Sequence, residues 1–396
     1  MRLAVVESAP RGGLLHYAAQ LAEALAARGH DVDLITARGH ELPAPLERAR
    51  VRAVLRAAVS RPSEPPTGGR YLLRRAGIAL RVLAASSRTL WEIAFGRYDA
   101  ALLVDDLSVT PAAAGALALT LLPQRPLIAA VCHEPRPRSR RPGADLYATS
   151  RPLLAVLAHV YARLDLVLVH GERSREVFKR TWRRAGAVAT IPHGDERLLA
   201  ETPPPPAAEE RVLFFGEWRR AKGLWELMAA FDELAGVRPQ IRLTIAGTPT
   251  ADVDPDGVRR WAHRHRGRVT IIDEYVPLEQ VREVFTSARV VAAPYLAGSQ
   301  SGVVHLAMTM ARAVVASDVG DLGSAVLDGE TGRLVPPGDA RALAVALEEV
   351  VADRRLAERL GTAGRRHALE TSSWETVAER VEAELDRLPR TPGRAG

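Results

Sequence analysis

The sequence predicts an α/β protein built from two Rossmann-like, doubly wound domains, each with a parallel sheet, that face each other across a cleft. Three observations lead to this fold class. Short apolar runs of strand length alternate with segments of helical periodicity through most of the chain. Four consecutive prolines at residues 203–206 divide this alternation into two halves. The length of 396 residues exceeds what one hydrophobic core ordinarily organises.

The first half begins with an apolar run at residues 2–7, which predicts a buried strand, and continues with a helix over residues 14–28. Prolines interrupt residues 40–98, where we expect basic helical patches between turns. Further strands are expected at residues 31–36, 100–104, 126–132 and 165–170. Residues 1–200 therefore form the first expected domain.

A stiff linker over residues 201–210 follows, because consecutive prolines cannot lie in a helix or a central strand. Residues 211–370 form the second expected domain, with strands at 211–215, 242–246, 269–272, 290–293 and 313–317 and helices at 223–235, 278–287, 302–311 and 340–352. An amphipathic helix over residues 374–388 is expected to pack back on the first domain. Doubly wound sheets bind ligands at the carboxyl ends of their strands, so the cleft is the expected site.

Composition excludes several classes of protein. Hydrophobic residues make up 47% of the chain and charged residues 26%, which excludes a disordered or collagen-like protein. No apolar run approaches the roughly 20 residues that a membrane-spanning helix needs. Glu7 interrupts any signal-peptide pattern, and the single cysteine, Cys132, excludes internal disulfides and cysteine-based zinc sites. We therefore expect a cytoplasmic protein.

The net charge of +7 arises in one segment, residues 46–91, which contains ten arginines and two glutamates, a difference of +8. A basic segment interleaved with apolar residues suggests an anionic membrane surface as partner, with the protein peripheral at the inner face. An arginine-rich solvated surface is the competing interpretation. Nucleic acid is not expected, because the segment lacks interleaved aromatic residues for base stacking.

Gly12 and Gly13 lie in the turn between the first strand and the first helix. Adjacent glycines allow backbone N–H groups to approach an oxygen-rich ligand at the start of a helix. The spacing is not Gly-x-Gly-x-x-Gly, so the turn predicts no dinucleotide site, and many such turns bind nothing.

A second strand-to-helix turn, residues 214–223, contains two cations beside glycines. Arg219 and Lys222 lie three positions apart and would neutralise a pyrophosphate leaving group. A solvated basic turn is the competing interpretation.

The third motif opens the helix expected at residues 302–311 and consists of Ser299, Gln300, Ser301, Gly302 and Val303. Small hydroxyl residues and unpaired N–H groups at a helix start suit an anion. In the competing interpretation, Ser301 is only the N-cap of the helix.

Histidines follow two predicted strands of the first domain. His133 and Glu134 lie at the carboxyl end of the strand at 126–132, and His193 follows Ile191 and Pro192. A single histidine is more often structural than catalytic, but two at strand ends facing one cleft favour a functional role.

In these motifs and in their order along the sequence, the chain resembles a GT-B fold retaining glycosyltransferase of family 4, also described as glycosyl transferases group 1. The resemblance spans nearly the whole chain and is strongest at residues 213–223, 243–249, 275–295 and 313–339. It implies transfer of a sugar from a nucleotide sugar to an acceptor, with retained anomeric configuration. It also implies that no cofactor or metal is needed.

The resemblance assigns roles to individual residues. Lys222 matches the lysine that binds the donor diphosphate, and His133 matches the histidine near the transferred sugar. With Arg219 these are the expected catalytic residues. The expected donor-binding residues are Gly12, Gly13, His193, Gly216, Lys222, Gly247, Thr248, Ser299, Gln300, Ser301, Gly302 and Val303.

Three positions depart from the family pattern. The family pairs two glutamates eight residues apart, and these positions hold Gly298 and Leu306 here. The position after Gly216, where the family has an arginine, holds Glu217 in this chain. Arg219 is close enough in the sequence to substitute for that arginine. This chain has a Ser-Gln-Ser-Gly run at residues 299–302 instead of the glutamate pair, and in this it resembles a subgroup of the family.

Two rival functions remain open at this point. A nucleotide-sugar hydrolase or epimerase would need cleft carboxylates, for which Glu134 is the main candidate. Loss of both glutamates instead favours a catalytically silent GT-B-like binding subunit. Asp252 and Asp254 form an Asp-x-Asp metal pattern, but they lie among turn residues and are interpreted as a loop.

Overall fold

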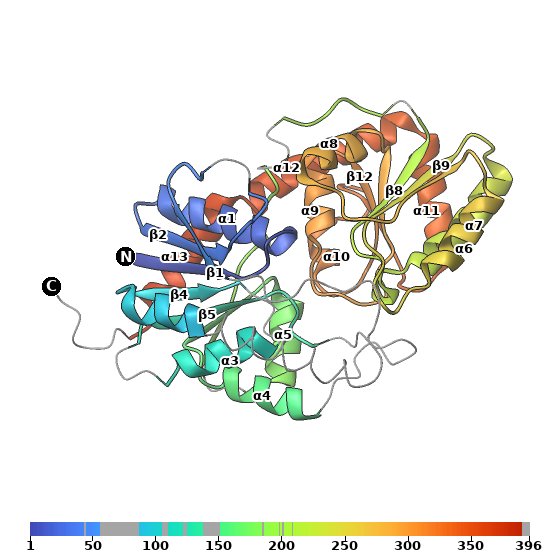
Figure 1. The fold of residues 1–396 in the computed structure, drawn as a ribbon. Helices are drawn as coiled ribbons and strands as arrows, with labels where there is room; N and C mark the ends of the chain where they lie inside the picture. The colour runs from blue at the N-terminus through green and yellow to red at the C-terminus, as the bar shows by residue number, and fades with distance from the viewer. Residues whose placement is uncertain are drawn as a thin grey trace.

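The computed structural model describes residues 1–42, 45–55, 87–104, 110–121, 125–137, 151–183, 186–197, 199, 202–207 and 209–389. Two lobes, each built on a parallel sheet, lie side by side (Figure 1). The predicted fold class is therefore confirmed.

The first sheet has seven strands in the order β3-β2-β1-β4-β5-β6-β7, and neighbouring strands are parallel. The strands are β1 (Arg2–Glu7), β2 (Asp31–Ala37), β3 (Arg50–Leu55), β4 (Ala100–Leu103), β5 (Leu127–Cys132), β6 (Leu166–Val169) and β7 (Ala187–Thr190). Along β1, Leu3 and Val5 face one apolar core, whereas Ala4 and Val6 face the other. Burial on both faces is why these strands are continuous apolar runs in the sequence.

Helices cover both faces of this sheet (Figure 1). On one face lie α1 (Gly13–Ala27) and α13 (Trp374–Asp386), and on the other lie α3 (Thr110–Leu119), α4 (Arg151–Tyr161) and α5 (Glu172–Thr181). Trp374, Val377 and Val381 of α13 are buried against α1 and the sheet. The C-terminal helix thus completes the core of the first lobe.

The second sheet has six parallel strands in the order β10-β9-β8-β11-β12-β13. They are β8 (Arg211–Phe215), β9 (Arg242–Ala246), β10 (Val269–Ile272), β11 (Val290–Ala293), β12 (Ala313–Ser317) and β13 (Arg333–Val335). One face packs against α6 (Leu224–Val237), α7 (Pro255–Arg264), α11 (Ala340–Ala352) and α12 (Arg354–Thr371). The other packs against α8 (Leu278–Thr286), α9 (Gly302–Thr309) and α10 (Leu322–Ala325), and a short 3₁₀ turn, η1 (Arg220–Lys222), precedes α6.

The prediction of basic helical patches throughout residues 40–98 is wrong at β3. This strand pairs with β2 at the edge of the sheet, where its arginines reach carboxylates of the neighbouring strand. Arg50 Nε donates to Asp33 Oδ1 over 2.8 Å, and Arg52 lies beside the same side chain. Alternating arginine and apolar residues is the pattern of a strand with one solvated face, which the prolines nearby obscured. A helix does occupy residues 87–95.

Residues 203–207 of the linker have no regular secondary structure. Arg312, which is buried, holds this segment to the second lobe: its Nη2 donates to the Pro205 carbonyl over 2.6 Å and its Nε to the Phe285 carbonyl over 3.0 Å. The chain returns to the first lobe through α12 and α13 (Figure 1). Within the described residues, the linker and the passage from α12 to α13 both connect the lobes.

Much of the basic segment at 46–91 and the C-terminal residues 390–396 lie outside the described residues. Within the described part of the chain, no helix combines the length and apolar character needed to cross a membrane.

Candidate functional site

The carboxyl ends of the two sheets meet at the interface between the lobes. Ser299, which follows β11, donates a hydrogen bond from Oγ to the carbonyl oxygen of His133, which follows β5. Arg173, at the start of α5, forms an ion pair with Asp318 over 2.7 Å. The residues predicted at these strand ends therefore lie on one surface between the lobes.

Asp321 joins the lobes at the N-terminus of α5. The backbone N–H groups of Arg173 and Ser174 donate to its two carboxylate oxygens over 3.0 and 2.9 Å. Asp321 is buried, and a Cβ at Gly171 would lie 2.4 Å from its carboxylate. The anion at this helix start thus comes from the second lobe, a contact that sequence reasoning missed.

Lys222 is held at the carboxyl end of β11. Its Nζ lies 3.7 Å from the ring centre of Tyr295, a cation–π contact. Gly223, at a φ of 69°, makes this close approach feasible, because a Cβ there would lie 1.7 Å from the carbonyl oxygen of Pro294. Lys222 is one of only two lysines in the chain, the other being Lys179.

Arg219 is oriented differently from Lys222. Its guanidinium pairs with Glu217 over 2.5 Å, so a neighbouring carboxylate partly neutralises its charge. Asp252 accepts a hydrogen bond from the Arg220 N–H over 3.1 Å, and Asp254 caps α7 by accepting from the Asp256 N–H. The Asp-x-Asp pattern is therefore part of the loop that supports this turn.

The ends of β8 and β9 are in close contact beside this turn. A Cβ at Gly247, where φ is 135°, would lie 2.0 Å from the carbonyl oxygen of Gly216. The Trp218 N–H donates to the Thr248 carbonyl over 2.9 Å. The structure thus brings together Gly216, Gly247 and Thr248, three of the predicted donor-binding residues.

Ser301 caps α9, because its Oγ accepts a hydrogen bond from the Val304 N–H over 3.3 Å. The same hydroxyl also bonds to the Tyr295 hydroxyl over 2.8 Å. Tyr295 therefore links Ser301 to Lys222. A Cβ at Gly216 would lie 3.5 Å from Val303 Cγ2, so the start of α9 packs beside the turn that carries the lysine. A fixed cation and a helix N-terminus each favour an anion.

Ser299 reaches the first lobe through the His133 carbonyl, and Ser299 and Gln300 both bond to Asp321, which contacts α5 of the first lobe. The Asp321 N–H donates to the Ser299 carbonyl over 2.7 Å, and Gln300 Nε2 donates to the Asp321 carbonyl over 3.3 Å. Gln300 Oε1 lies 3.3 Å from Nε2 of His305 on α9. The predicted Ser299–Val303 motif thus spans from the first lobe to the helix start.

Four histidines and Tyr17 form a cluster at the interface, with His133, His170 and His193 from the first lobe and His305 from the second. His133 Nδ1 lies 3.1 Å from His170 Nε2, and the ring of His193 stacks on His305 with centroids 4.6 Å apart. Tyr17 of α1 contacts the first three rings edge-on. We name this set the histidine cluster.

Burial keeps the histidine cluster uncharged. Removal from water, with smaller effects from neighbouring histidines, lowers the pKa of His133 to about 3. Burial lowers the pKa of His193 to about 4, and the pKa values of His170 and His305 also lie well below 6.5. His133 as a whole is half-buried, and its Nε2 is buried. Neutral imidazoles can donate or accept hydrogen bonds here without adding positive charge.

Glu196 lies beside the cluster and was not predicted. It is buried, and Gln20 Nε2 donates to its Oε2 over 3.1 Å. Burial raises the pKa of Glu196 to about 8, with Asp195 adding to the shift. A Cβ at Gly302 would lie 3.7 Å from Glu196 Oε1 and 3.6 Å from His193. Glu196 and His193 therefore lie at van der Waals distance from the start of α9.

The two positions where the family has glutamates hold a buried leucine and a glycine. Leu306 is 5% exposed and packs in the core behind α9, so it does not face the other lobe. Gly298 lies where a Cβ at Gly320 would be 2.2 Å from its carbonyl oxygen. Among the described residues, no group of three or more histidine, cysteine or acidic side chains could hold a metal ion.

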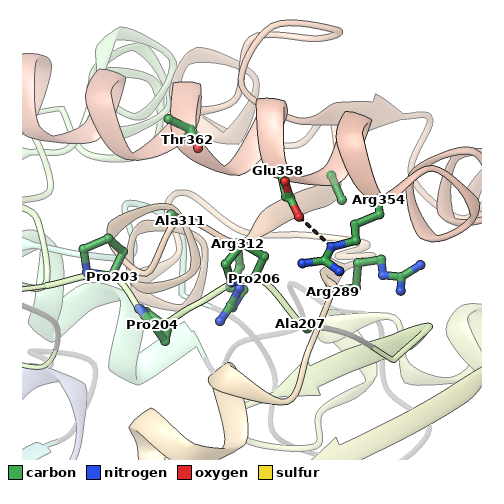
Figure 2. Close-up of a pocket in the computed structure, with 11 residues that line it drawn as sticks. Pro203, Pro204, Pro206, Ala207, Arg289, Ala311, Arg312, Arg354, Glu358 and Thr362 are labelled. Atoms are coloured by element: carbon green, nitrogen blue, oxygen red, sulfur yellow. Dashed lines mark hydrogen bonds and ion pairs between the residues drawn. The ribbon is translucent and has the colours of Figure 1, made fainter.

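A cavity of about 150 Å³ lies elsewhere, beside the linker. Figure 2 shows the linker prolines on one side and α12 on the other. The ion pair of Arg354 with Glu358, 2.7 Å long, lies on its wall. Its lining contains none of the predicted site residues and consists of Pro203, Pro204, Pro206, Ala207, Arg289, Ala311, Arg312, Arg354, Ala357, Glu358 and Thr362.

Two parallel-sheet lobes that meet at the carboxyl ends of their strands define the GT-B class of fold. Comparison with known families agrees. Residues 11–194 match the profile described as Glycosyltransferase Family 4, and residues 209–353 match the one described as Glycosyl transferases group 1. The chain belongs to this family of GT-B glycosyltransferases.

Curated relatives match over parts of the chain. The chain is 35% identical over 246 residues to the alpha-maltose-1-phosphate synthase of Mycobacterium tuberculosis, covering 59% of this chain and 60% of that protein. It is 31% identical over 194 residues to the phosphatidyl-myo-inositol mannosyltransferase of Mycolicibacterium smegmatis, covering 48% and 47%. The matched region thus spans about half to three fifths of these relatives.

Solved structures share the fold over nearly the full length. The sucrose-phosphate synthase of Thermosynechococcus elongatus superposes with a TM-score of 0.74 at 22% identity, covering 98% of both chains. Anabaena HepE in complex with UDP-glucose superposes with a TM-score of 0.70 at 16% identity, covering 98% of this chain and 100% of that one.

Proposed function

We propose that the protein transfers a sugar from a nucleoside diphosphate sugar to an acceptor, with retention of the anomeric configuration. The observation that carries this proposal is the surface formed by Lys222 and the start of α9. Tyr295 joins the two, contacting the lysine ammonium with its ring and Ser301 with its hydroxyl. A diphosphate at this place would meet a fixed cation and a helix N-terminus together.

The chemistry of the transfer fits these groups. As the glycosidic bond to the diphosphate breaks, negative charge develops on the leaving oxygen and positive charge on the sugar. Fixed positive charge at Lys222 would stabilise the first, an effect worth several kcal/mol where the groups are preorganised. His133, with its pKa lowered to about 3 by burial, would offer a neutral imidazole that does not repel the positive sugar.

Uracil is the first base to test in the donor. Structures of Anabaena HepE contain UDP, UDP with glucose, or UDP-glucose. Gly216, Gly247 and Thr248 line the ends of β8 and β9, where the base and ribose would lie. We propose that this part of the site holds the nucleoside and that the reaction proceeds without a metal ion.

Lys222→Ala tests the proposal through donor binding. Calorimetry with UDP should show at least a tenfold weaker affinity for the variant, because a charge-assisted contact to phosphate is lost. Lys179→Ala is the matched control, since Lys179 is exposed on α5 and is the only other lysine. Equal UDP affinity in the wild type and Lys222→Ala would contradict the assigned role of Lys222.

A catalytically silent binding subunit is the second candidate. Leu306 is packed in the core where a family glutamate would be expected, and this favours a lost catalytic function. Incubating the purified chain with UDP-glucose and a panel of acceptors separates the cases. Glycosylated product supports transfer, free glucose supports hydrolysis, and UDP binding without turnover supports the silent subunit.

Binding to an anionic membrane surface is proposed as a property of the same protein. Trp91 and Phe95, on the helix at 87–95, are 56% and 67% exposed, with ring centroids 4.2 Å apart. Exposed aromatic residues next to arginines are typical of interfacial segments. Co-sedimentation with phosphatidylglycerol vesicles should fall with added salt and with Trp91→Ala. Equal binding to phosphatidylcholine vesicles would refute the electrostatic part.

A further inference from the structure

The carboxyl group of Glu196 is buried and has one unpaired oxygen. The residue is 7% exposed, and Gln20 Nε2 donates a hydrogen bond to Oε2 over 3.1 Å. Among the described residues, Oε1 has no hydrogen-bond partner, and no arginine, lysine or histidine forms an ion pair with this carboxyl group. A buried polar oxygen without a partner costs free energy, so Oε1 points to a ligand that supplies one.

This oxygen lies at the start of α9. It is 3.7 Å from where a Cβ of Gly302, the first residue of the helix, would be. Cα–Cβ bonds tilt toward the N-terminus of a helix, so Oε1 lies at the N-terminal end of α9. In the part of the chain that the structure describes, the N–H groups of Gly302 and Val303 have no hydrogen-bond partner either. Both residues are half-buried, which leaves the helix start accessible to a ligand.

Burial determines the charge of the Glu196 side chain. Removal from water, with a contribution from Asp195, raises its pKa to about 8, so the carboxyl group holds its proton at neutral pH. Because Oε2 accepts the hydrogen bond from Gln20, the proton lies on Oε1. Oε1 is then a donor beside the two N–H donors of α9. Three donors at one helix start favour an anionic ligand.

We propose that Glu196 binds the sugar donor: its carboxylic acid donates a hydrogen bond from Oε1 to the diphosphate at the start of α9. This inference rests on the proposed function, in which Lys222 and α9 hold the diphosphate. It adds a contact from the first lobe to a group that the second lobe holds. A carboxylate at the same place would repel the diphosphate, so the affinity for the donor should fall when this acid loses its proton.

The neighbouring titratable groups keep their charge between pH 7 and pH 9. His193 and the other rings of the histidine cluster are neutral, because burial lowers the pKa of His193 to about 4 and the others also lie well below 6.5. Burial raises the pKa of Tyr17, which therefore keeps its proton. Asp195 pairs with Arg197 over 2.9 Å, which favours its charged form, and Arg365 of α12, which donates to the Thr309 carbonyl, is also a permanent cation.

UDP binding measured by calorimetry between pH 7 and pH 9 tests the proposal. The second pKa of a phosphate monoester is about 6, so the charge of UDP is nearly constant in this range. If only the acid form binds, a pKa of about 8 predicts that the wild type binds UDP about tenfold more weakly at pH 9 than at pH 7. The amide of Glu196→Gln donates at every pH, so its affinity should change by at most about twofold. An equal fall in the wild type and in Glu196→Gln would overturn the proposal.

Glu196→Ala removes the donor altogether. We expect this variant to bind UDP at least about fivefold more weakly than the wild type at pH 7, because a hydrogen bond to a charged group is lost. Glu279→Gln is the matched control, since Glu279 is an exposed acid in the first turn of α8. Its UDP affinity should follow the wild type at every pH. Wild-type affinity in Glu196→Ala at pH 7 would contradict the contact, and melting temperatures verify that each variant is folded.

The two proposals fail in different ways. Absence of UDP binding by the wild type at every pH would contradict the proposed function and this inference together. UDP binding whose pH dependence is the same with glutamate and glutamine at position 196 would overturn this inference alone.

Discussion

Acidification should destabilise the protein through its histidine cluster. The pKa values of the buried histidines lie below the ordinary value of 6.5. At a pH between the folded-state pKa and 6.5, the unfolded chain therefore binds protons that the folded chain does not bind. Stability contributed by these neutral rings is therefore fully present above pH 6.5 and is lost as the pH falls toward the folded-state pKa.

The size of the effect follows from the pKa values of about 3 for His133 and about 4 for His193. At pH 5, which is 1.5 units below the ordinary histidine pKa of 6.5, both rings are still neutral in the folded state but are protonated in the unfolded chain. Each ring therefore lowers the free energy of unfolding by about 2 kcal/mol. The pair thus accounts for about 4 kcal/mol between pH 7.5 and pH 5. His170 and His305 act in the same direction.

Glu196 acts in the opposite direction. Its pKa is raised to about 8, so the folded state holds a proton that the unfolded chain releases above pH 4.5. That contribution is present below pH 4.5 and is lost as the pH rises toward 8. Acidification from pH 7.5 to 5 therefore restores about 3 kcal/mol through Glu196 and masks much of the histidine effect.

Urea unfolding at pH 7.5 and pH 5, followed by tryptophan fluorescence, checks this account. His133→Asn should reduce the acid-induced loss by about 2 kcal/mol, and Glu196→Gln should increase it by about 3 kcal/mol. His159→Asn, at an exposed position on α4, is the control and should match the wild type. Identical pH dependence in all four proteins would refute the reasoning.

Two further substitutions test the backbone and the contact between the lobes. Gly223→Ala should destabilise the protein by about 1–3 kcal/mol in urea unfolding and weaken UDP binding, because the new Cβ would lie 1.7 Å from the Pro294 carbonyl oxygen. Gly236→Ala is the control: position 236 lies in α6 with open space around it, so this change should be neutral or stabilising. Asp321→Ala should cost about 0.5–2 kcal/mol and accelerate amide exchange at the start of α5, whereas Asp318→Ala, which breaks an exposed ion pair, should cost at most about 1 kcal/mol. Unaltered stability in Gly223→Ala, or equal effects of the two aspartate variants, would contradict these arguments.

The fold class could be predicted because a parallel sheet covered on both faces leaves a local signal. Strands such as β1 and β12 are buried on both sides and so appear as short apolar runs between helices. The same alternation placed Gly216, Lys222 and Ser301 at strand ends, where ligands of such sheets bind. Edge strands carry a weaker signal, and β3 was missed because one of its faces is polar.

By itself, the sequence determined the two doubly wound sheets and which loops follow their strands. Only the tertiary structure decided which of those loops meet. Glu41 and Tyr275 are 234 positions apart and share hydrogen bonds, and Asp321 caps a helix 147 positions earlier. Hydrophobic periodicity records which face of an element is buried, whereas the partner across the interface depends on how two separately formed lobes dock. That information is spread over both lobes and leaves no pattern along the chain.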